Sequence, residues 1–425
     1  MKQLYQKIIQ EWWERPLPAI IPRETDLTDF VSPNATLNKV VTLTGFRRTG
    51  KTYLLLALAA KLGQRNCVYI NFEDERIPQE TQSLTALLDT IEEISDNPKL
   101  TLLLDEVQNI PNWGKWVRRI NETKQYQLVL TGSSSKLSSN ELPTELRGRS
   151  LNVHVAPLNF REFAKFKNVD LKNVSQEVVL RNLREFLTYG GLPEVVLAEE
   201  GKKYLLLDEY LQTFVRRDII ERYKLRVENQ FTALLNLILN STEYTVGKLT
   251  DSLNSVGFTT SKATVSRYLS HLEKSYFLHS LYLHNANVKN RMQASKKCYF
   301  VDSFFVTRLA GAFSQNTGRL MEHKVFEKLL TRSREKFGDT LYYWRNQQKY
   351  EVDFVVRKGE KVIELVQVSY IVNGGLLPER EVRNLILAGK NLGCTNLTLV
   401  TWDLKKMLER SGFKINFIPL AEFLG

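Results

Sequence analysis

The 425-residue sequence has only three cysteines, Cys67, Cys298 and Cys394, and none of them forms a CxxC pair. This spacing excludes a zinc ribbon and a disulfide framework and is typical of a protein from a reducing compartment. No apolar run approaches the ~20 residues that a membrane helix needs. The first eighteen residues contain two glutamates and no small-residue cleavage site, so they do not resemble a secretory signal. We therefore expect a cytoplasmic protein without a membrane partner.

Basic residues outnumber acidic ones, with 59 Lys and Arg against 47 Asp and Glu, a net charge of +12. A surplus of this size favours a polyanionic partner, of which nucleic acid is the commonest. Charge that only keeps the protein soluble is the alternative. The length suggests two to four domains, but no Ser/Pro-rich linker or internal repeat marks their boundaries.

Apolar runs rich in β-branched residues alternate with helical patterns over residues 39–155. This alternation predicts an α/β fold with a parallel sheet covered on both faces. Two helices are expected between the runs, at Tyr53–Leu62 and Leu84–Ser95. The runs predicted as buried strands are Val40–Thr44, Cys67–Phe72, Leu100–Asp105, Gln127–Thr131 and Leu151–Val155.

The segment Gly45–Thr52 reads GFRRTGKT and matches the pattern GxxxxGK[ST] without a mismatch. An expected strand precedes it and an expected helix follows, which is the setting of a phosphate-binding loop rather than a chance match. Glycines let successive N–H groups turn toward phosphates, and the helix adds its positive N-terminal end. We expect Lys51 to reach the β- and γ-phosphates of ATP and Thr52 to ligate Mg²⁺. The residues expected around ATP or ADP are Gly45, Phe46, Arg47, Arg48, Thr49, Gly50, Lys51, Thr52 and Tyr53.

Two carboxylates, Asp105 and Glu106, follow the apolar strand Leu100–Leu104. Ligands of α/β sheets bind at the carboxyl ends of the strands. We therefore expect Asp105 to hold Mg²⁺ through water and Glu106 to orient and deprotonate the attacking water. A solvated strand end is the alternative.

Polar and basic residues lie between the fourth and the fifth expected strands of this sheet. Ser133 or Ser134, after Gln127–Thr131, is expected to sense the γ-phosphate, although either can belong to a plain turn. Arg147 and Arg149 are expected to complete the ATP site of a neighbouring subunit as arginine fingers, or else to anchor their own loop.

These motifs together resemble the AAA-type ATPases that carry a C-terminal DUF4143 domain, a prokaryotic family of poorly defined role. The motifs that carry the resemblance are GFRRTGKTYLL, LLLDEVQNIPNW, LTGSSSKLSSNELPTELRGRS, PLNFREF, GGLPEVV and FVRRDIIERY. The resemblance implies that Lys51, Thr52, Asp105 and Glu106 bind and hydrolyse Mg-ATP. It also implies that Arg147 or Arg149 matches the arginine of an LxGR segment. It does not imply a substrate.

Residues 245–283 predict a helix, a turn at Gly257-Phe258 and a second helix, Ser261–Lys274. A winged helix-turn-helix would read DNA with the second helix, where Lys262 and Arg267 lie away from the apolar face. The segment Asn285–Val301 has no carboxylate, as a DNA-touching wing would. A protein-docking or structural role is the alternative. The residues expected to bind DNA are Lys262, Arg267, Lys289, Arg291, Lys296 and Lys297.

Residues 319–369 resemble a PD-(D/E)xK nuclease-like fold, with Glu322 on a helix and Asp353 on a strand. In active members an Asp and an acidic-x-Lys strand hold Mg²⁺ and activate water. Here that strand reads Gln367-Val368-Ser369, and Glu364 is displaced by three residues. Because side chains alternate along a strand, Glu364 and Gln367 cannot share one metal without a bulge. We therefore expect no nuclease activity.

The sequence thus predicts a P-loop ATPase core with an N-terminal helix (1–156), a helical lid (157–230), a winged-helix segment (231–316) and a nuclease-like α/β domain (317–425). The leading hypothesis is a homo-oligomer, as a ring or otherwise, that uses ATP to act on DNA as a motor or remodeller. An ATP-gated switch that docks a protein, without DNA, is the second hypothesis.

Overall fold

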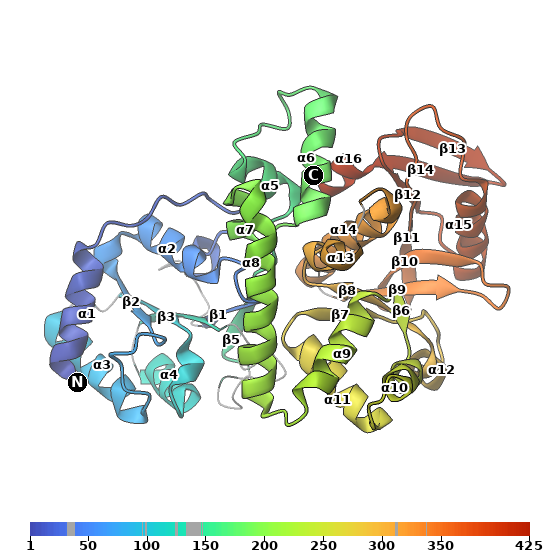
Figure 1. Cartoon of the computed structure of the whole chain (residues 1–425). Helices are drawn as coiled ribbons and strands as arrows, with labels where there is room; N and C mark the ends of the chain where they lie inside the picture. Colours follow the sequence, from blue (N-terminus) through green and yellow to red (C-terminus); the bar gives the residue numbers. More distant parts are fainter. Residues whose placement is uncertain are drawn as a thin grey trace. The chain divides into compact units, whose positions relative to one another are not determined.

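The computed structural model describes residues 1–31, 39–95, 97, 100–123, 126–132, 146, 148–310, 313–336 and 338–425. The chain divides into two compact units (Figure 1). Unit 1 contains residues 1–156 and 274–276, and unit 2 contains residues 157–273 and 277–425. Within the described ranges, no helix combines the length and the apolar character that a membrane span requires.

Unit 1 is built on a five-stranded parallel sheet of order β2-β3-β4-β1-β5. The predicted parallel sheet is confirmed. Strands β1 to β4 are apolar at three or four of their five positions, and they are buried between two layers of helices. The strands are β1 (Val40–Thr44), β2 (Cys67–Asn71), β3 (Thr101–Asp105), β4 (Gln127–Thr131) and β5 (Ser150–His154).

Strand β5 differs from the expectation of a buried strand. It lies at the edge of the sheet and pairs only with β1 among the described strands. Leu151 is 39% exposed, and no residue of β5 is buried. The prediction of a buried strand was therefore wrong for β5. Its burial depends on its edge position in the sheet, which the apolar residues of the segment do not indicate.

Helices cover the two faces of this sheet. Helices α1 (Lys2–Glu14), α3 (Thr81–Ile94) and α4 (Trp113–Thr123) pack on one face over a cluster that includes Leu102 and Leu104 (Figure 1). Helix α2 (Lys51–Leu62) packs on the other face, where Leu103 belongs to a second cluster. The alternation of β3 side chains between the two clusters follows the two-residue period of a strand. Short 3₁₀ turns lie at Thr28–Phe30, Gln64–Asn66 and Val107–Asn109.

Unit 2 begins with helices, as expected for residues 157–230. The helices are α5 (Phe160–Phe166), α6 (Gln176–Tyr189), α7 (Pro193–Leu197), α8 (Glu200–Thr213), the π-helical segment Phe214–Glu221 and α9 (Glu228–Leu239). Asn159 and Glu162 form a reciprocal capping box that starts α5. Proline at the first position of α7 needs no N–H partner there, so it starts a helix directly after the break at Gly190-Gly191.

The next part of unit 2 contains α10 (Val246–Ser255), α11 (Lys262–Lys274) and a three-stranded antiparallel sheet. The sheet has the order β6-β8-β7, with β6 at Glu243–Tyr244, β7 at Leu278–Leu281 and β8 at Lys296–Phe300. The connection from β7 to β8, which was expected to act as a wing, contains helix α12 (Val288–Gln293). The Asn287 side chain accepts the N–H of Asn290 and caps the start of that helix.

The last part of unit 2 is a six-stranded mixed sheet of order β13-β14-β12-β11-β10-β9. Helix α15 (Glu379–Leu392) packs against one face, and α14 (Phe313–Glu335) brings Phe326 onto Phe354 of the sheet. The short helices α13 (Phe304–Ala310) and α16 (Leu420–Leu424) complete this part. Its strands are β9 (Asp339–Arg345), β10 (Glu351–Lys358), β11 (Lys361–Val368), β12 (Leu397–Thr401), β13 (Lys406–Arg410) and β14 (Phe413–Pro419).

The double glycine Gly190-Gly191 is a packing constraint inside unit 2. The Gly191 N–H donates to a carboxylate oxygen of Asp302 at 2.7 Å, and its carbonyl accepts the N–H of Leu158 at 2.7 Å. A Cβ on Gly191 would lie 2.2 Å from the carbonyl oxygen of Leu158. Only glycine allows this approach of two backbones.

We predict that Gly191→Ala lowers the free energy of unfolding by about 2 to 3 kcal/mol, because the added methyl group must push backbone apart. The control is Gly201→Ala, where a Cβ meets nothing within 4 Å and helix propensity favours alanine by up to about 1 kcal/mol. Urea unfolding of both variants measures the difference. Equal stability of the two variants would contradict the packing argument.

Candidate active site

The loop between β1 and α2 has a conformation that depends on two glycines. Gly45 has φ 149°, and a Cβ there would lie 2.3 Å from the carbonyl oxygen of Val155. Gly50 has φ 93°, which favours glycine as well. Arg23 braces the loop by donating to the carbonyl oxygens of Thr49 at 2.9 Å and Ala156 at 3.0 Å. The loop is therefore held in a conformation that glycines permit and the N-terminal segment supports.

Lys51 is the first residue of α2 and is buried, with 6% of the residue exposed. Its ammonium donates to two carbonyl oxygens of the loop, that of Gly45 at 3.1 Å and that of Phe46 at 2.9 Å. These acceptors keep the charge inside the loop, at the positive end of α2. A phosphate entering the loop would meet this ammonium directly.

Asp105 ends β3 and accepts hydroxyl hydrogen bonds from three other elements. Its Oδ2 accepts from Thr52 at 2.8 Å and from Tyr69 at 2.9 Å, and its Oδ1 accepts from Thr131. Burial raises the pKa of Asp105, and the three hydroxyls oppose that rise. The carboxylate is thus pre-oriented beside the Thr52 hydroxyl.

Glu106 follows in a left-handed conformation, with φ 53°. Its N–H donates to the Thr131 hydroxyl at 3.1 Å, and its side chain accepts from the Gln108 amide. Positive φ is uncommon for glutamate and is often found where a site constrains the backbone. In this arrangement Gln108 occupies one oxygen of the carboxylate that is expected to act as the base.

Tyr69, Thr131 and Gln108 were missed by the sequence analysis. Burial raises the pKa of Tyr69 far above its usual range, so its hydroxyl stays a donor to Asp105. Thr131 ends β4, directly beside β3. Its position as the polar end of an apolar strand was visible in the sequence, but the strand order that places it there was not.

The remaining residues expected at this site fall into three groups. Phe46 and Thr49 are buried inside the loop, Arg47 is half-buried, and Arg48 and Tyr53 are exposed. Ser133, Ser134 and Arg147 lie outside the described residues. The guanidinium of Arg149 lies 3.1 Å from a carboxylate oxygen of Glu122, within its own unit. An Arg149 finger would have to leave that ion pair first.

A second polar cluster lies in unit 2, where the nuclease-like site was expected. It is centred on Lys297 of β8, which is 7% exposed. Its ammonium lies 3.0 Å from Glu322, 2.8 Å from Glu351 and 2.8 Å from Asp353. We call these four residues the Lys297 cluster. The expectation that Lys297 binds DNA does not hold, because its charge is buried and neutralised by carboxylates.

The carboxylates of this cluster outnumber its ammonium. Burial, opposed by Lys297, raises the pKa of Asp353 to about 7, and the carboxylates hold the pKa of Lys297 well above its usual value. Gln367 accepts the N–H of Asp353 at 3.1 Å, whereas Glu364 pairs with Arg332. As expected, Glu364 and Gln367 do not meet at one point. Among the described residues, no group of His, Cys, Asp or Glu is arranged to hold a metal ion.

The other residues expected to bind DNA differ in exposure. Lys262, Arg267 and Lys289 are exposed. Arg291 lies over the ring of Tyr342, with 5.8 Å from its guanidinium carbon to the ring centroid, and Lys296 lies over Tyr282, with 4.7 Å from its ammonium. Among these six cations, therefore, three are exposed, two are half-buried on aromatic rings and one is buried.

The loop, the lysine at the start of α2 and the acidic end of β3 define a P-loop site on a parallel α/β sheet. A nucleotide with Mg²⁺ fits the groups present, since the Thr52 hydroxyl and Asp105 carboxylate lie side by side as hard oxygen ligands. Models of three families match the chain: an AAA domain over residues 37–164, DUF8612 over residues 180–316 and DUF4143 over residues 317–372.

An uncharacterized protein of Methanocaldococcus jannaschii is 34% identical over 374 residues, which cover 85% of this chain and 81% of that protein. An uncharacterized protein of Haemophilus influenzae is 28% identical over 411 residues, covering 94% of this chain and 98% of that protein. The chain belongs to the family of AAA-type P-loop ATPases with a C-terminal DUF4143 domain. A solved Walker-type ATPase of Pyrococcus abyssi is 17% identical, covers 70% of this chain and 98% of its own, and has a TM-score of 0.48.

We predict that Lys51→Ala abolishes ATP binding, because the ammonium inside the loop is lost. Glu106→Gln should bind ATP but release phosphate at least about 100-fold more slowly, as expected for loss of a general base. Titration with a fluorescent ATP analogue and a phosphate-release assay measure the two effects. Lys61→Ala is the matched control, because this exposed lysine of α2 pairs with Asp26, away from the loop. Wild-type turnover in Glu106→Gln would contradict the assignment of the base.

The Lys297 cluster predicts that the C-terminal part does not cut DNA. The ammonium already lies where three carboxylates converge, so a divalent cation would have to displace it. Linear, branched and single-stranded DNA should survive incubation with Mg²⁺ or Mn²⁺, as measured on denaturing gels. Cleavage that disappears in Asp353→Asn would show that the cluster does bind a metal.

Proposed function

We propose that this protein binds and hydrolyses ATP and uses the cycle to act on DNA, as a motor or remodeller. The observation that carries the proposal is the convergence of Lys51, Thr52 and Asp105 on one loop at the carboxyl edge of the sheet. Membership of an AAA-type ATPase family supports the hydrolytic part. The DNA part is supported by the net charge of +12 and by the exposed cations of unit 2.

Each residue of the site would have a separate role. Lys51 and the loop N–H groups would hold the phosphates, and Thr52 with Asp105 would hold Mg²⁺, which would neutralise charge on the β- and γ-phosphates. Glu106 would orient water and accept its proton. Gln108 donates to one oxygen of the Glu106 carboxylate and would help to orient it toward the water. The Thr131 hydroxyl donates to the Asp105 carboxylate and accepts the backbone N–H of Glu106, so it is positioned to transmit a change at one residue to the other.

Helix α11 is the surface that we assign to DNA. With α10 and the strands β7 and β8 it would form a winged helix, and its exposed face carries Lys262 and Arg267. Lys289, in the connection between β7 and β8, would act as part of the wing. Neither α11 residue has an ion-pair partner among the described residues, so both charges are available to phosphates.

The organisation of the chain remains part of the proposal. The ATPase core would span residues 1–156, the lid 157–230, the winged-helix segment 231–316 and the nuclease-like domain 317–425. We further propose a homo-oligomer in which Arg147 or Arg149 reaches the ATP site of a neighbour, once Arg149 has left Glu122.

An ATP-gated switch that docks a protein is the second candidate. The observation that favours it concerns the basic residues of α12 and the start of β8: Lys297 is buried, and Lys296 and Arg291 lie over aromatic rings. This segment therefore exposes less charge than its sequence suggests. A docking module would bind its partner without a steep salt dependence.

We predict that the chain binds duplex DNA and that log affinity falls against log salt with a slope of about −0.9 per phosphate contact. Lys262→Gln with Arg267→Gln should weaken binding and flatten this slope by about two contacts. The matched control is Lys358→Gln with Lys390→Gln, which removes the same charge from exposed residues elsewhere in unit 2. Fluorescence anisotropy at several salt concentrations measures both variants. Equal slopes would favour the docking function.

A further inference from the structure

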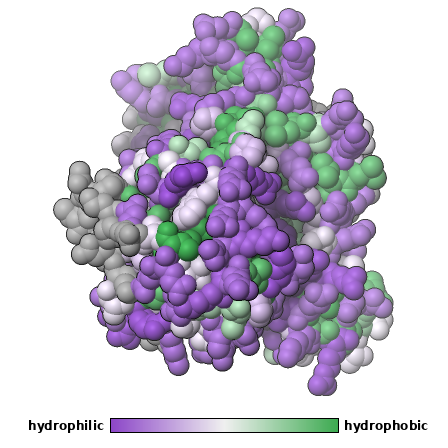
Figure 2. Space-filling model, turned by 90° about the vertical axis from the view of Figure 1, so that its left-hand side faces the viewer, coloured by the Kyte–Doolittle hydropathy of each residue, from purple (hydrophilic) through white to green (hydrophobic). Residues whose placement is uncertain are grey.

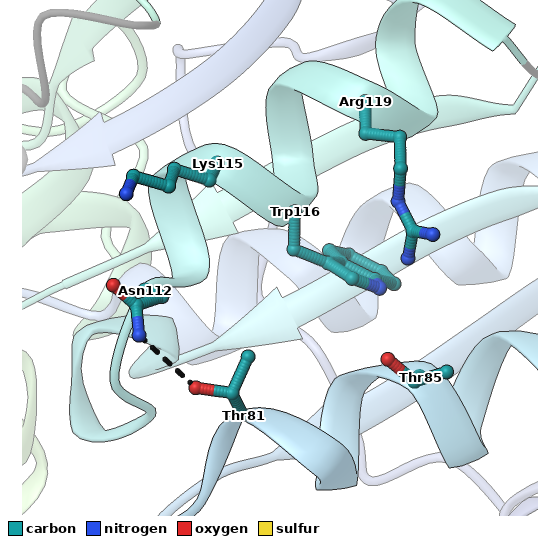
Figure 3. A pocket seen from close by; sticks show the side chains of 6 residues that line it. All are labelled: Thr81, Thr85, Asn112, Lys115, Trp116 and Arg119. Atoms are coloured by element: carbon teal, nitrogen blue, oxygen red, sulfur yellow. Dashed lines mark hydrogen bonds between the residues drawn. The ribbon is translucent and has the colours of Figure 1, made fainter.

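A hollow of about 440 Å³ lies between helices α3 and α4 of unit 1 (Figure 3). It is lined by Thr81, Thr85, Asn112, Lys115, Trp116 and Arg119, and we call it the α3–α4 pocket. Figure 2 shows the surface from the left-hand side of Figure 1 as mostly hydrophilic, with hydrophobic residues in small separate patches. The lining of the pocket is itself polar apart from the ring of Trp116.

The lining contains hydrogen-bond donors and no carboxylate. The exposed side chains of Lys115 and Arg119 form no hydrogen bond or ion pair with any described residue. Only 4% of Trp116 is exposed, and its indole N–H has no acceptor among the described residues. In Figure 3 the indole nitrogen lies at the ring edge that faces the Arg119 guanidinium and Thr85. Several donors therefore face one space whose lining contains no carboxylate to neutralise the two cations.

The ends of two helices add to this polarity. Helix α3 begins at Thr81 and α4 at Trp113, so the pocket lies beside both N-terminal turns. Asn112 donates to the Thr81 hydroxyl at 3.2 Å, and that hydroxyl donates to the carbonyl oxygen of Pro111 at 3.1 Å. The first-turn N–H groups of both helices contribute partial positive charge here. The helix ends alone would not define a site, but the buried indole N–H is an independent donor in need of an acceptor.

We propose that the α3–α4 pocket binds a phosphate ester, with Lys115 and Arg119 as its counter-charges and the Trp116 N–H as a directional donor. Two cations match the double charge of a terminal phosphate or the charges of two neighbouring phosphodiesters. A single carboxylate would leave one cation unneutralised. Because the Arg119 side chain is exposed and holds no described partner, it can move aside to let an oxygen atom reach the indole.

The pocket is joined to the ATP site through a short stretch of backbone. Six residues separate Glu106 from Trp113, and in this stretch the Asn109 N–H donates to the Glu106 carbonyl and the Ile110 N–H to that of Val107. An anion that pulls on the first turn of α4 would thus act on the segment that holds Glu106 and Gln108. This inference deepens the proposed function: the phosphate ester is either a small phosphorylated effector or the backbone of the nucleic acid.

The experiment starts from Lys51→Ala protein, so that the phosphate loop does not contribute to binding. Inorganic pyrophosphate, titrated by calorimetry, probes the free-anion source, and a labelled single-stranded oligonucleotide, followed by anisotropy, probes the nucleic-acid source. Lys115→Gln with Arg119→Gln should weaken at least one probe tenfold or more. Trp116→Phe, which keeps the ring and loses the N–H, should weaken it severalfold. Arg118→Gln is the matched control, because Arg118 lies on the same helix but pairs with Glu122.

The outcomes separate this proposal from the proposed function. Pyrophosphate binding lost in the double variant, without DNA binding, would support the pocket and contradict the DNA role. DNA binding lost through Lys262 and Arg267 but unchanged in the double variant, with no pyrophosphate effect, would support the DNA role and overturn the pocket. Circular dichroism of each variant checks folding. Binding equal to that of Arg118→Gln in both folded variants overturns the proposal.

Discussion

The carboxylate of Asp105 is the point at which unit 1 is organised. Hydroxyls from α2, β2 and β4 donate to this one buried group, so the phosphate loop and three neighbouring strands meet at a single acceptor. A buried charge is tolerated only when hydrogen bonds compensate its lost hydration. The same bonds that stabilise the carboxylate therefore set the position of Thr52 relative to β3, and the position of the segment that follows β3.

The Lys297 cluster shows the opposite solution to the same problem. Carboxylates from α14 and β10, which in a metal-dependent nuclease would face a divalent cation, surround an ammonium from β8. Breaking a buried ion pair by removing one partner costs roughly 3–5 kcal/mol, because the remaining charge is left uncompensated. The cluster thus fastens the three-stranded sheet to the six-stranded one within unit 2. A residue that seemed a DNA contact in the sequence is part of the internal framework.

The position of Glu106 between the phosphate loop and the α3–α4 pocket bears on how ATP turnover would be controlled. Glu106 accepts a hydrogen bond from Gln108 and lies seven residues before Trp113, the first residue of α4, whose first turns line the α3–α4 pocket. The expected base therefore lies between the nucleotide loop and a second set of anion donors. This proximity offers a physical route by which a bound phosphate ester would alter hydrolysis without contacting ATP.

The sequence by itself determined the parallel sheet, the phosphate loop and the pair Asp105-Glu106, because these depend on local patterns. An apolar run, a glycine at a turn and the fixed GxxxxGK[ST] spacing can each be recognised within a few consecutive residues. The helix pair α10–α11, the break at Gly190-Gly191 and the separation of Glu364 from Gln367 were predictable for the same reason. Each follows from the period or the backbone freedom of a short segment.

Only the tertiary structure decided which distant side chains meet. Tyr69 and Thr131 contact Asp105 because β3 lies between β2 and β4, an order that no local pattern encodes. The exposure of Leu151 follows from the edge position of β5, and the burial of Lys297 from the approach of β8 to α14 and β10. Trp116, by its spacing, belongs to the apolar face of α4, but only the tertiary structure shows that its buried N–H meets no acceptor among the described residues. Burial and charge pairing depend on contacts between segments far apart in the chain. Local sequence patterns therefore could not predict them.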